Sequence, residues 1–168
     1  MKIRTRRRRL PGTRRVAEKT PQGVLLRTHR AVRSKTRLMA ALDTNVVVRL
    51  MTGDDPRQTA RAKKLLKSES CSVAPSVLME CEWVLRAAYG MDAALIAQLF
   101  RRLLELEQLA PQSPALTERV LDAFEAGMDF ADALHALQTP EGESFATFDA
   151  ALVKRAARAG LRSVVRAG

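Results

Sequence analysis

Short apolar runs alternate along the chain with longer stretches in which apolar residues recur every three or four positions. The first pattern is typical of buried strands, and the second is typical of amphipathic helices. The predicted strands are residues 39–43, 71–74, 109–112, 143–149 and 162–165, and the predicted helices are residues 46–53, 56–68, 75–90, 93–107, 113–127, 131–138 and 151–160.

Proline and glycine mark the expected ends of several of these helices. Pro56 and Pro75 stand at predicted helix starts, whereas Gly53 and Gly90 follow the last turns, which is the usual placement of both residues. Strands that alternate with helices indicate an α/β fold, and we expect a three-layer sandwich whose short, mainly parallel sheet is covered on both faces. The extra helices between residues 75 and 138 would be inserted on one side.

Charge divides the chain into two parts. Residues 1–38 hold 14 of the 29 Lys and Arg residues but only one of the 18 acidic residues. Such a like-charged segment is too repulsive to fold alone and would bind polyanions nonspecifically. We therefore predict a basic tail over 1–38 and one domain over 39–168. An alternative is that Met39 is the true start and that the tail is an over-extended translation start.

The remaining composition excludes several classes of protein. No uninterrupted apolar run is long enough to span a bilayer, and no apolar segment of a secretory signal follows the arginines, so we expect a cytoplasmic protein. The two cysteines, Cys71 and Cys81, have no metal-binding spacing and are expected to pack in the core.

Two acidic residues follow predicted strands directly. Asp43 ends the first strand and Asp149 ends the fourth. Each alone favours a helix N-cap, because an aspartate at that position accepts hydrogen bonds from free amides. Ligands of parallel sheets bind at the carboxyl ends of the strands, however. On neighbouring strands the two carboxylates would lie close enough to share a cation.

The helix after Pro75 carries two glutamates in different surroundings. At 100° per residue, Glu80 shares its side with the apolar residues Trp83, Val84 and Ala87, whereas Glu82 is paired with Arg86 four residues on. We therefore expect Glu82 to be solvated and Glu80 to lie on a buried side, where a carboxylate needs a partner. That partner is a metal ion or, alternatively, a distant arginine or backbone amide.

The sequence DFADALHAL supplies the last acidic candidate. Asp129 precedes a predicted helix and Asp132 lies three residues later, which resembles a capping box. Asp129 suits the capping position, and this leaves Asp132 to point into a cleft. His135 is expected to pack or to lie at the rim rather than to bind a metal.

Four acids without histidine or cysteine partners indicate a hard divalent cation. Asp43, Glu80, Asp132 and Asp149 would offer oxygen ligands, which Mg²⁺ and Mn²⁺ prefer. Crowded carboxylates repel one another and attract a cation. The chemistry that follows most directly is metal-dependent hydrolysis of a phosphodiester.

Four segments together resemble the PIN domain, and within it the VapC-type toxins of toxin–antitoxin pairs. These segments are LDTNVVVRL, MECEWVLRAAYG, DFADALHAL and TFDAAL. The resemblance covers about 130 residues and implies that Asp43, Glu80, Asp132 and Asp149 are the catalytic metal ligands, supported by Asn45 and Thr147. It further implies a Mg²⁺- or Mn²⁺-dependent endoribonuclease that cleaves cellular RNA, a homodimer, and a cognate antitoxin that blocks the acidic cleft.

Two other functions compete with this interpretation. A noncatalytic nucleic-acid-binding protein would use the basic tail as its arm, and its acids would be ordinary helix caps. A phosphoryl-transfer enzyme or phospho-receiver would form an aspartyl phosphate. Haloacid-dehalogenase-like enzymes usually require a second aspartate where this chain has Asn45, and the paired acids and strand-end lysine of a receiver are not found in the sequence. Glu80 argues against the noncatalytic binding protein, which does not need it.

Overall fold

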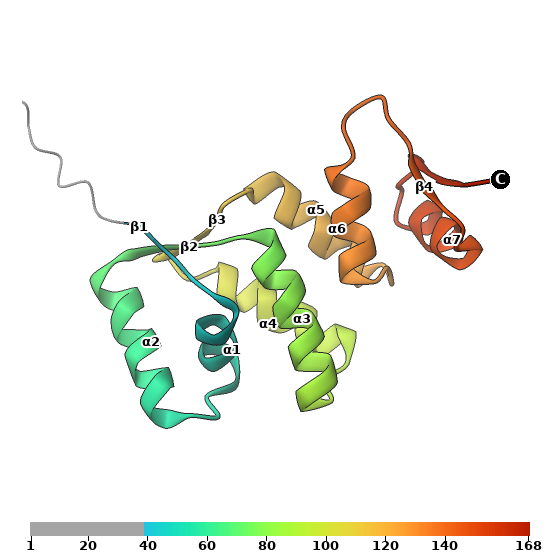
Figure 1. Cartoon of the computed structure of the whole chain (residues 1–168). Helices are drawn as coiled ribbons and strands as arrows, with labels where there is room; N and C mark the ends of the chain where they lie inside the picture. Colours follow the sequence, from blue (N-terminus) through green and yellow to red (C-terminus); the bar gives the residue numbers. More distant parts are fainter. Residues whose placement is uncertain (1–38) are drawn as a thin grey trace, which may run out of the picture. The chain divides into compact units, whose positions relative to one another are not determined.

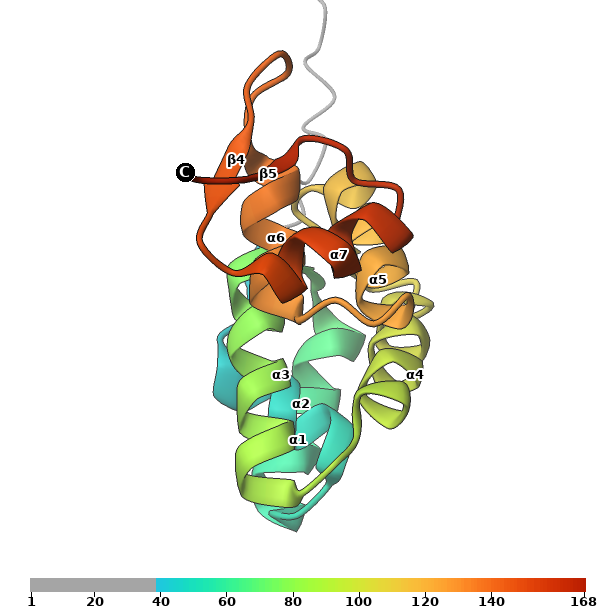
Figure 2. The same cartoon turned by 90° about the vertical axis from the view of Figure 1, so that its right-hand side faces the viewer.

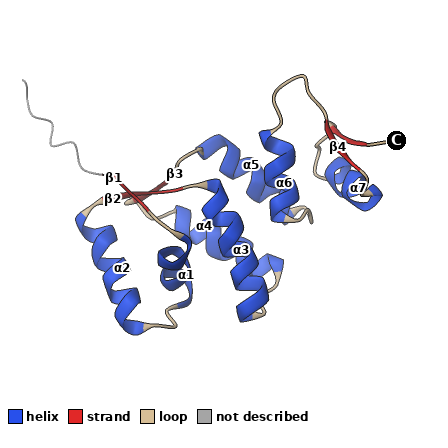
Figure 3. Ribbon diagram, in the orientation of Figure 1, coloured by secondary structure: helices blue, strands red, loops and turns tan. Residues whose placement is uncertain are grey.

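The structure is a computed structural model that describes residues 39–168, so the predicted basic tail lies outside the described residues. The described chain contains short strands and longer helices in alternation (Figures 1 and 3). In chain order the elements are β1 (Met39–Ala41), α1 (Thr44–Thr52), α2 (Pro56–Ser68), β2 (Ser70–Val73), α3 (Pro75–Tyr89), α4 (Ala93–Leu104), β3 (Leu109–Pro111), α5 (Pro114–Glu125), α6 (Phe130–Gln138), β4 (Phe145–Thr147), α7 (Ala150–Arg158) and β5 (Val164–Arg166).

All the strand pairs are parallel, and the predicted mixed α/β class is confirmed. Met39 lies opposite Ser70, and Cys71 lies opposite Leu109, so that β1, β2 and β3 form one sheet in that order. Phe145 lies opposite Val164 in a second sheet made of β4 and β5. Helical crossovers join the strands of each pair, as parallel pairing requires.

The division into two sheets differs from the single sheet that the sequence predicts. As a result β1 and β4 are not neighbours, and the expectation that Asp43 and Asp149 follow adjacent strands is not met. The cause lies in the connection from β3 to β4. Its two helices, α5 and α6, pack on each other and against α4 and α3. They stand between the two sheets in Figure 1, and Figure 2 shows α7 in front of them.

Local sequence signals set the helix ends as predicted. Gly53 and Gly90 adopt the left-handed conformation after α1 and α3, with φ of 66° and 63°, a region that suits glycine because it has no Cβ. Asp92 caps α4 by accepting a hydrogen bond from the Leu95 amide at 2.8 Å. β1 and β4 are shorter than predicted, and the acids expected at their ends, Asp43 and Asp149, cap the next helices instead. Asp149, predicted as the end of a strand, is the N-cap of α7.

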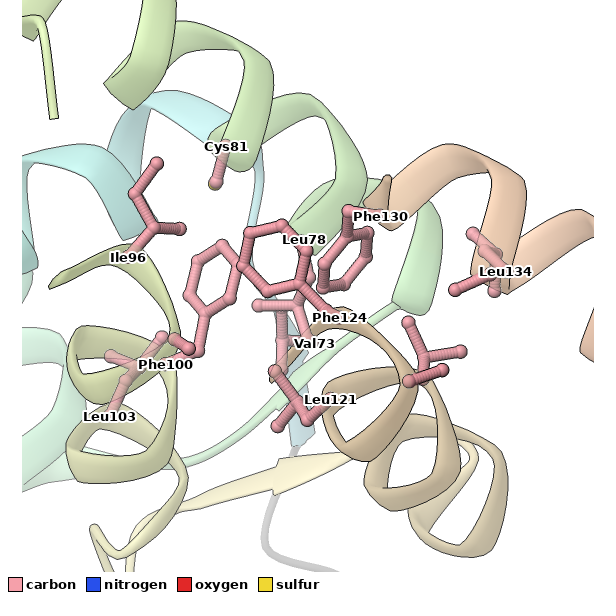
Figure 4. Packing of buried hydrophobic residues seen from close by; sticks show 14 of the residues in the cluster. Val73, Leu78, Cys81, Ile96, Phe100, Leu103, Leu121, Phe124, Phe130 and Leu134 are labelled. Carbon is pink, nitrogen blue, oxygen red and sulfur yellow. The ribbon is translucent and has the colours of Figure 1, made fainter. Parts of the chain in front are cut away.

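The core lies where α3, α4, α5 and α6 meet the first sheet (Figure 4). Phe130 is 1% exposed, and its ring packs edge-on against Phe100 and Phe124 with centroid separations of 5.6 and 5.5 Å. Cys71 and Cys81 are buried free thiols, which confirms their predicted packing role. No helix among residues 39–168 has both the length and the apolar character needed to cross a membrane.

Replacing Phe130 by Ala is expected to lower the free energy of unfolding by about 3–5 kcal/mol, because it leaves a cavity between two other rings. Urea denaturation followed by circular dichroism measures this change. The matched control is Phe148→Ala, whose ring is 84% exposed, and its effect should stay within about 0.5 kcal/mol. Equal losses in the two variants would contradict the described core.

Candidate functional site

The first pair of candidate acids lies where β1 leads into α1. Asp43 is the N-cap of α1, and its Oδ1 accepts a hydrogen bond from the Val46 amide at 2.9 Å. The next residue, Thr44, donates its hydroxyl to Oε2 of Glu80 on α3 at 2.6 Å. Thr44 therefore connects the helix that Asp43 caps to the second acid. Capping engages one oxygen of Asp43 and so does not exclude a second role for the other.

The predicted environments of the two glutamates on α3 are wrong. Glu82 is 3% exposed, whereas Glu80 is exposed. The buried stripe of α3 is formed by Leu78, Cys81, Glu82 and Leu85, which follow helical spacing. The apolar residues beside Glu80 misled the prediction because Trp83, at 65% exposed, faces outwards. The exposure of Glu80 suits a metal ligand. The sequence argument, which selected Glu80 because it expected this side chain to be buried, is therefore not the reason for the choice.

Arg86 compensates the buried Glu82. Its Nη2 lies 2.9 Å from Oε2 of Glu82 and 3.0 Å from Oδ2 of Asp129, the N-cap of α6. Burial raises the pKa of Glu82, and Arg86 opposes that change. Oε1 of Glu82 has no hydrogen-bond partner among the described residues. Arg86 thus holds α3 to α6 across a buried carboxylate.

The pKa of Asp129 shows how strongly its neighbours stabilise the charged form. Burial alone would raise this pKa, but the hydrogen bond from Arg86 and those from the Asp132 and Ala131 amides outweigh burial. The pKa of Asp129 is therefore lowered. Oδ1 accepts from the Ala131 amide at 3.0 Å, which confirms that Asp129 caps α6, as the sequence predicts.

The second pair of candidate acids is Asp132 on α6 and Asp149 at the start of α7. Nη2 of Arg155 lies between them, 3.7 Å from Oδ2 of Asp132 and 3.4 Å from Oδ2 of Asp149. Burial and the charges of Asp129 and Asp149 raise the pKa of Asp132, and Arg155 only partly offsets this. Hydrogen bonds from the Leu152 and Ala151 amides lower the pKa of Asp149.

The two predicted supporting residues occupy the same neighbourhoods. Asn45 lines a pocket of about 260 Å³ together with Asp43 and Arg61. The Thr147 hydroxyl accepts a hydrogen bond from the Asp149 amide at 3.0 Å and so fixes the start of α7. His135 is exposed on α6.

Three contacts at the site were not predicted, namely those of Thr44 with Glu80, of Arg86 with Asp129 and of Arg155 with the second pair of acids. The spacing of four residues between Glu82 and Arg86 predicted the contact of these two residues, but not the contact of Arg86 with Asp129. No local pattern signals the Thr44 or Arg155 contacts, because their partners are distant in the sequence.

The four predicted ligands thus form two pairs, Asp43 with Glu80 and Asp132 with Asp149. Their oxygen donors suit Mg²⁺ or Mn²⁺. Among residues 39–168, however, no group of three or more His, Cys, Asp or Glu side chains is arranged to hold a metal ion. One described chain therefore does not present the four carboxylates as a single metal site.

Comparison with protein families matches residues 40–159 to the PIN domain. The chain belongs to the PIN domain family. The matched segment includes both carboxylate pairs, so the PIN domain of this chain carries every candidate acid. PIN domains are generally metal-dependent nucleases, and membership suggests a nuclease here. Searches of curated proteins and of solved structures found no match.

Replacing Arg86 by Met in this PIN domain is expected to lower the free energy of unfolding by about 1–3 kcal/mol at pH 7, because it leaves the buried Glu82 carboxylate without its partner. The double variant Glu82→Gln, Arg86→Met should recover part of that loss, since it removes the buried charge as well. Urea denaturation of both variants measures the difference. A double variant less stable than Arg86→Met would argue against this role of Arg86.

Proposed function

We propose that this PIN domain protein is a Mg²⁺- or Mn²⁺-dependent endoribonuclease, and that it is the toxin of a toxin–antitoxin pair of the VapC type. The observation that carries the proposal is the family match over residues 40–159, which includes Asp43, Glu80, Asp132 and Asp149. Their oxygen donors suit the divalent cation, which when bound supplies an activated water and neutralises charge at the phosphate.

The positions of the acids support these roles. Asp43 and Glu80 lie on elements joined by the Thr44 hydrogen bond, and Asp132 and Asp149 share Arg155. We assign all four as metal ligands, with Asn45 and Thr147 in support. Arg155 lies between the carboxylates of Asp132 and Asp149. A bound cation would neutralise the same two groups, so Arg155 would have to move when metal binds.

The proposed substrate is cellular RNA, whose cleavage would inhibit translation. Its phosphates need positive charge near Asp43, although the part of the chain from residue 39 onward has 15 basic and 17 acidic residues. Arg61 supplies such a charge, since it is exposed on α2 and lines the same pocket as Asp43. Phosphate contacts of this kind give affinity without sequence information.

The proposed antitoxin requires a surface that accepts a protein segment. A pocket of about 390 Å³ between α1, α2 and α4 is lined by Leu50, Met51, Leu66 and Leu103 and rimmed by Lys63, Lys67 and Arg102. An amphipathic helix with acidic residues beside its apolar face fits this combination. We propose that one segment of the cognate antitoxin binds here while another blocks the acidic cleft, and that the toxin forms a homodimer.

Replacing Asp43 by Asn is expected to reduce metal-dependent RNA cleavage strongly. Loss of a group that only hydrogen-bonds a metal ligand costs about 10- to 100-fold in activity, and loss of the ligand Asp43 itself should cost more. Asparagine still caps a helix, so the fold should persist. The measurement is cleavage of total RNA with Mg²⁺, Mn²⁺ or a chelator, together with growth of cells that express each protein. Wild-type expression should arrest growth and the variant should not.

The matched control for Asp43 is Asp92→Asn. Asp92 is also an exposed aspartate that caps a helix through the amide three residues on, but it caps α4 away from the acids. This variant should cleave RNA as the wild type does. Wild-type activity in Asp43→Asn, or equal losses in both variants, would sink the proposed role of Asp43.

Replacing Arg61 by Glu is expected to weaken RNA binding and to flatten its dependence on salt, because one phosphate contact is lost. Fluorescence anisotropy with a labelled RNA at several salt concentrations measures both effects. Arg119→Glu changes the same charge on α5, where Arg119 lines a different pocket. Unchanged binding by Arg61→Glu, or an equal loss in Arg119→Glu, would remove Arg61 from the interface.

A further inference from the structure

The single tryptophan of this chain is exposed close to one of the candidate acids. Trp83 lies on α3 and is 65% exposed. The rings of Phe100, Phe124 and Phe130, in contrast, are almost fully buried and pack in the core. Tryptophan gains more from burial than most side chains do. The core of the described domain therefore leaves its largest aromatic ring in contact with water.

Trp83 is part of an apolar wall and not an isolated surface residue. It lines a pocket of about 350 Å³ together with Met79 of α3 and Ala131 of α6. Met79 lies four residues before Trp83, and residues at this spacing are neighbours on a helix surface. The volume falls within the range of about 300–1,000 Å³ that is usual for sites of small organic groups. The other lining residues, all charged, are Glu80, Glu82, Arg86 and Asp129.

The charged residues of this pocket leave positive charge accessible. Arg86 contacts Glu82 and Asp129 through the same nitrogen, Nη2, and its side chain is 50% exposed. A guanidinium has five N–H donors, so donors remain that can reach a phosphate. The pocket thus combines an aromatic ring, a partly exposed arginine and the proposed metal ligand Glu80.

We propose that Trp83 stacks on one unpaired base of the RNA substrate, next to the bond that is cleaved. Unpaired bases of RNA stack on aromatic side chains. Trp83 follows Glu80 by three residues, which is about 4.5 Å along the helix axis, and both residues line the pocket. A base on Trp83 therefore keeps its own backbone beside the carboxylate of Glu80. This inference rests on the proposed function and adds a requirement for an unpaired nucleotide.

A base fits this place better than a second protein surface does. Glu80 is exposed one turn from Trp83, so a protein laid over the ring would also cover the Glu80 carboxylate. That burial would cost free energy and would keep the substrate away. A base covers the ring alone and leaves the carboxylate open to a cation. A duplex does not fit in the same way, because its bases are already stacked on one another.

The stacking can be measured directly, because Trp83 is the only source of tryptophan fluorescence in the chain. The full chain carrying Asp43→Asn is titrated in Mg²⁺ with oligouridylate, which this variant should leave intact. Two other probes have the same length and charge per strand, namely an abasic ribose phosphate chain and oligouridylate paired with oligoadenylate. Oligouridylate should quench the fluorescence, whereas the abasic chain and the duplex should change it little.

Three results of the titration would overturn the inference. Absence of quenching would show that no base reaches Trp83, and equal quenching by the abasic chain would show that the backbone is responsible. Emission that shifts to shorter wavelength as the protein concentration rises, without RNA, would show that a second copy covers Trp83. The readout needs no cleavage. A wild-type protein that does not cleave RNA would therefore refute the proposed function, while quenching would still report stacking.

A variant series at Trp83 separates stacking from general apolar contact. Trp83→Ala should weaken oligouridylate binding about 5- to 150-fold, the range for loss of one stacked base. Trp83→Phe keeps a ring and should recover part of the affinity, whereas Trp83→Leu should not. Fluorescence anisotropy of labelled oligouridylate measures binding at raised salt, where nonspecific phosphate contacts are weak.

The matched control for this series is Leu95→Ala. Leu95 is an exposed apolar residue of α4, at 43%, and it does not line the pocket of Trp83. This variant should bind oligouridylate as the wild type does. Wild-type binding by Trp83→Ala, or equal binding by Trp83→Leu and Trp83→Phe, would overturn the stacking role.

Discussion

Repulsion between carboxylates is the constraint on which the arrangement of this domain depends. Burial raises the pKa of Asp132 most, and the charges of Asp129 and Asp149 raise it further, so these groups can lie close together only where positive charge or amide groups compensate them. Arg86 and Arg155 provide that charge. Helix N-termini provide the rest, since Asp129 and Asp149 each accept two backbone amides.

The same constraint relates the two sheets to the two carboxylate pairs. One sheet leads into the pair formed by Asp43 and Glu80, and the other leads into Asp149, which shares Arg155 with Asp132. Arg155 compensates the second pair in part, whereas the first pair accepts hydrogen bonds from the Thr44 hydroxyl and the Val46 amide.

Much of the fold could be predicted from the sequence because its signals are local. Gly90 and Asp92 mark helix ends through the conformation and hydrogen bonds of a few adjacent residues. The burial of Glu82 could not be predicted in this way, because it depends on Asp129 and α6 covering that side of α3. Residue types alone predicted that the side of α3 with Trp83 is buried, although Trp83 is exposed. The pairing partners of β1 and β4 could not be predicted either, because they depend on how distant helices pack.

The two cysteine thiols of this chain both lie in the core of the described domain. Cys71 is 1% exposed and Cys81 is fully buried, and burial, with smaller effects from Glu80 and Asp43, raises the pKa of the Cys81 thiol to about 12. A thiol in this state is a poor nucleophile and a poor target for oxidants. Alkylating reagents would therefore modify these cysteines only in molecules that have opened, and the rate of labelling would follow the opening of the core.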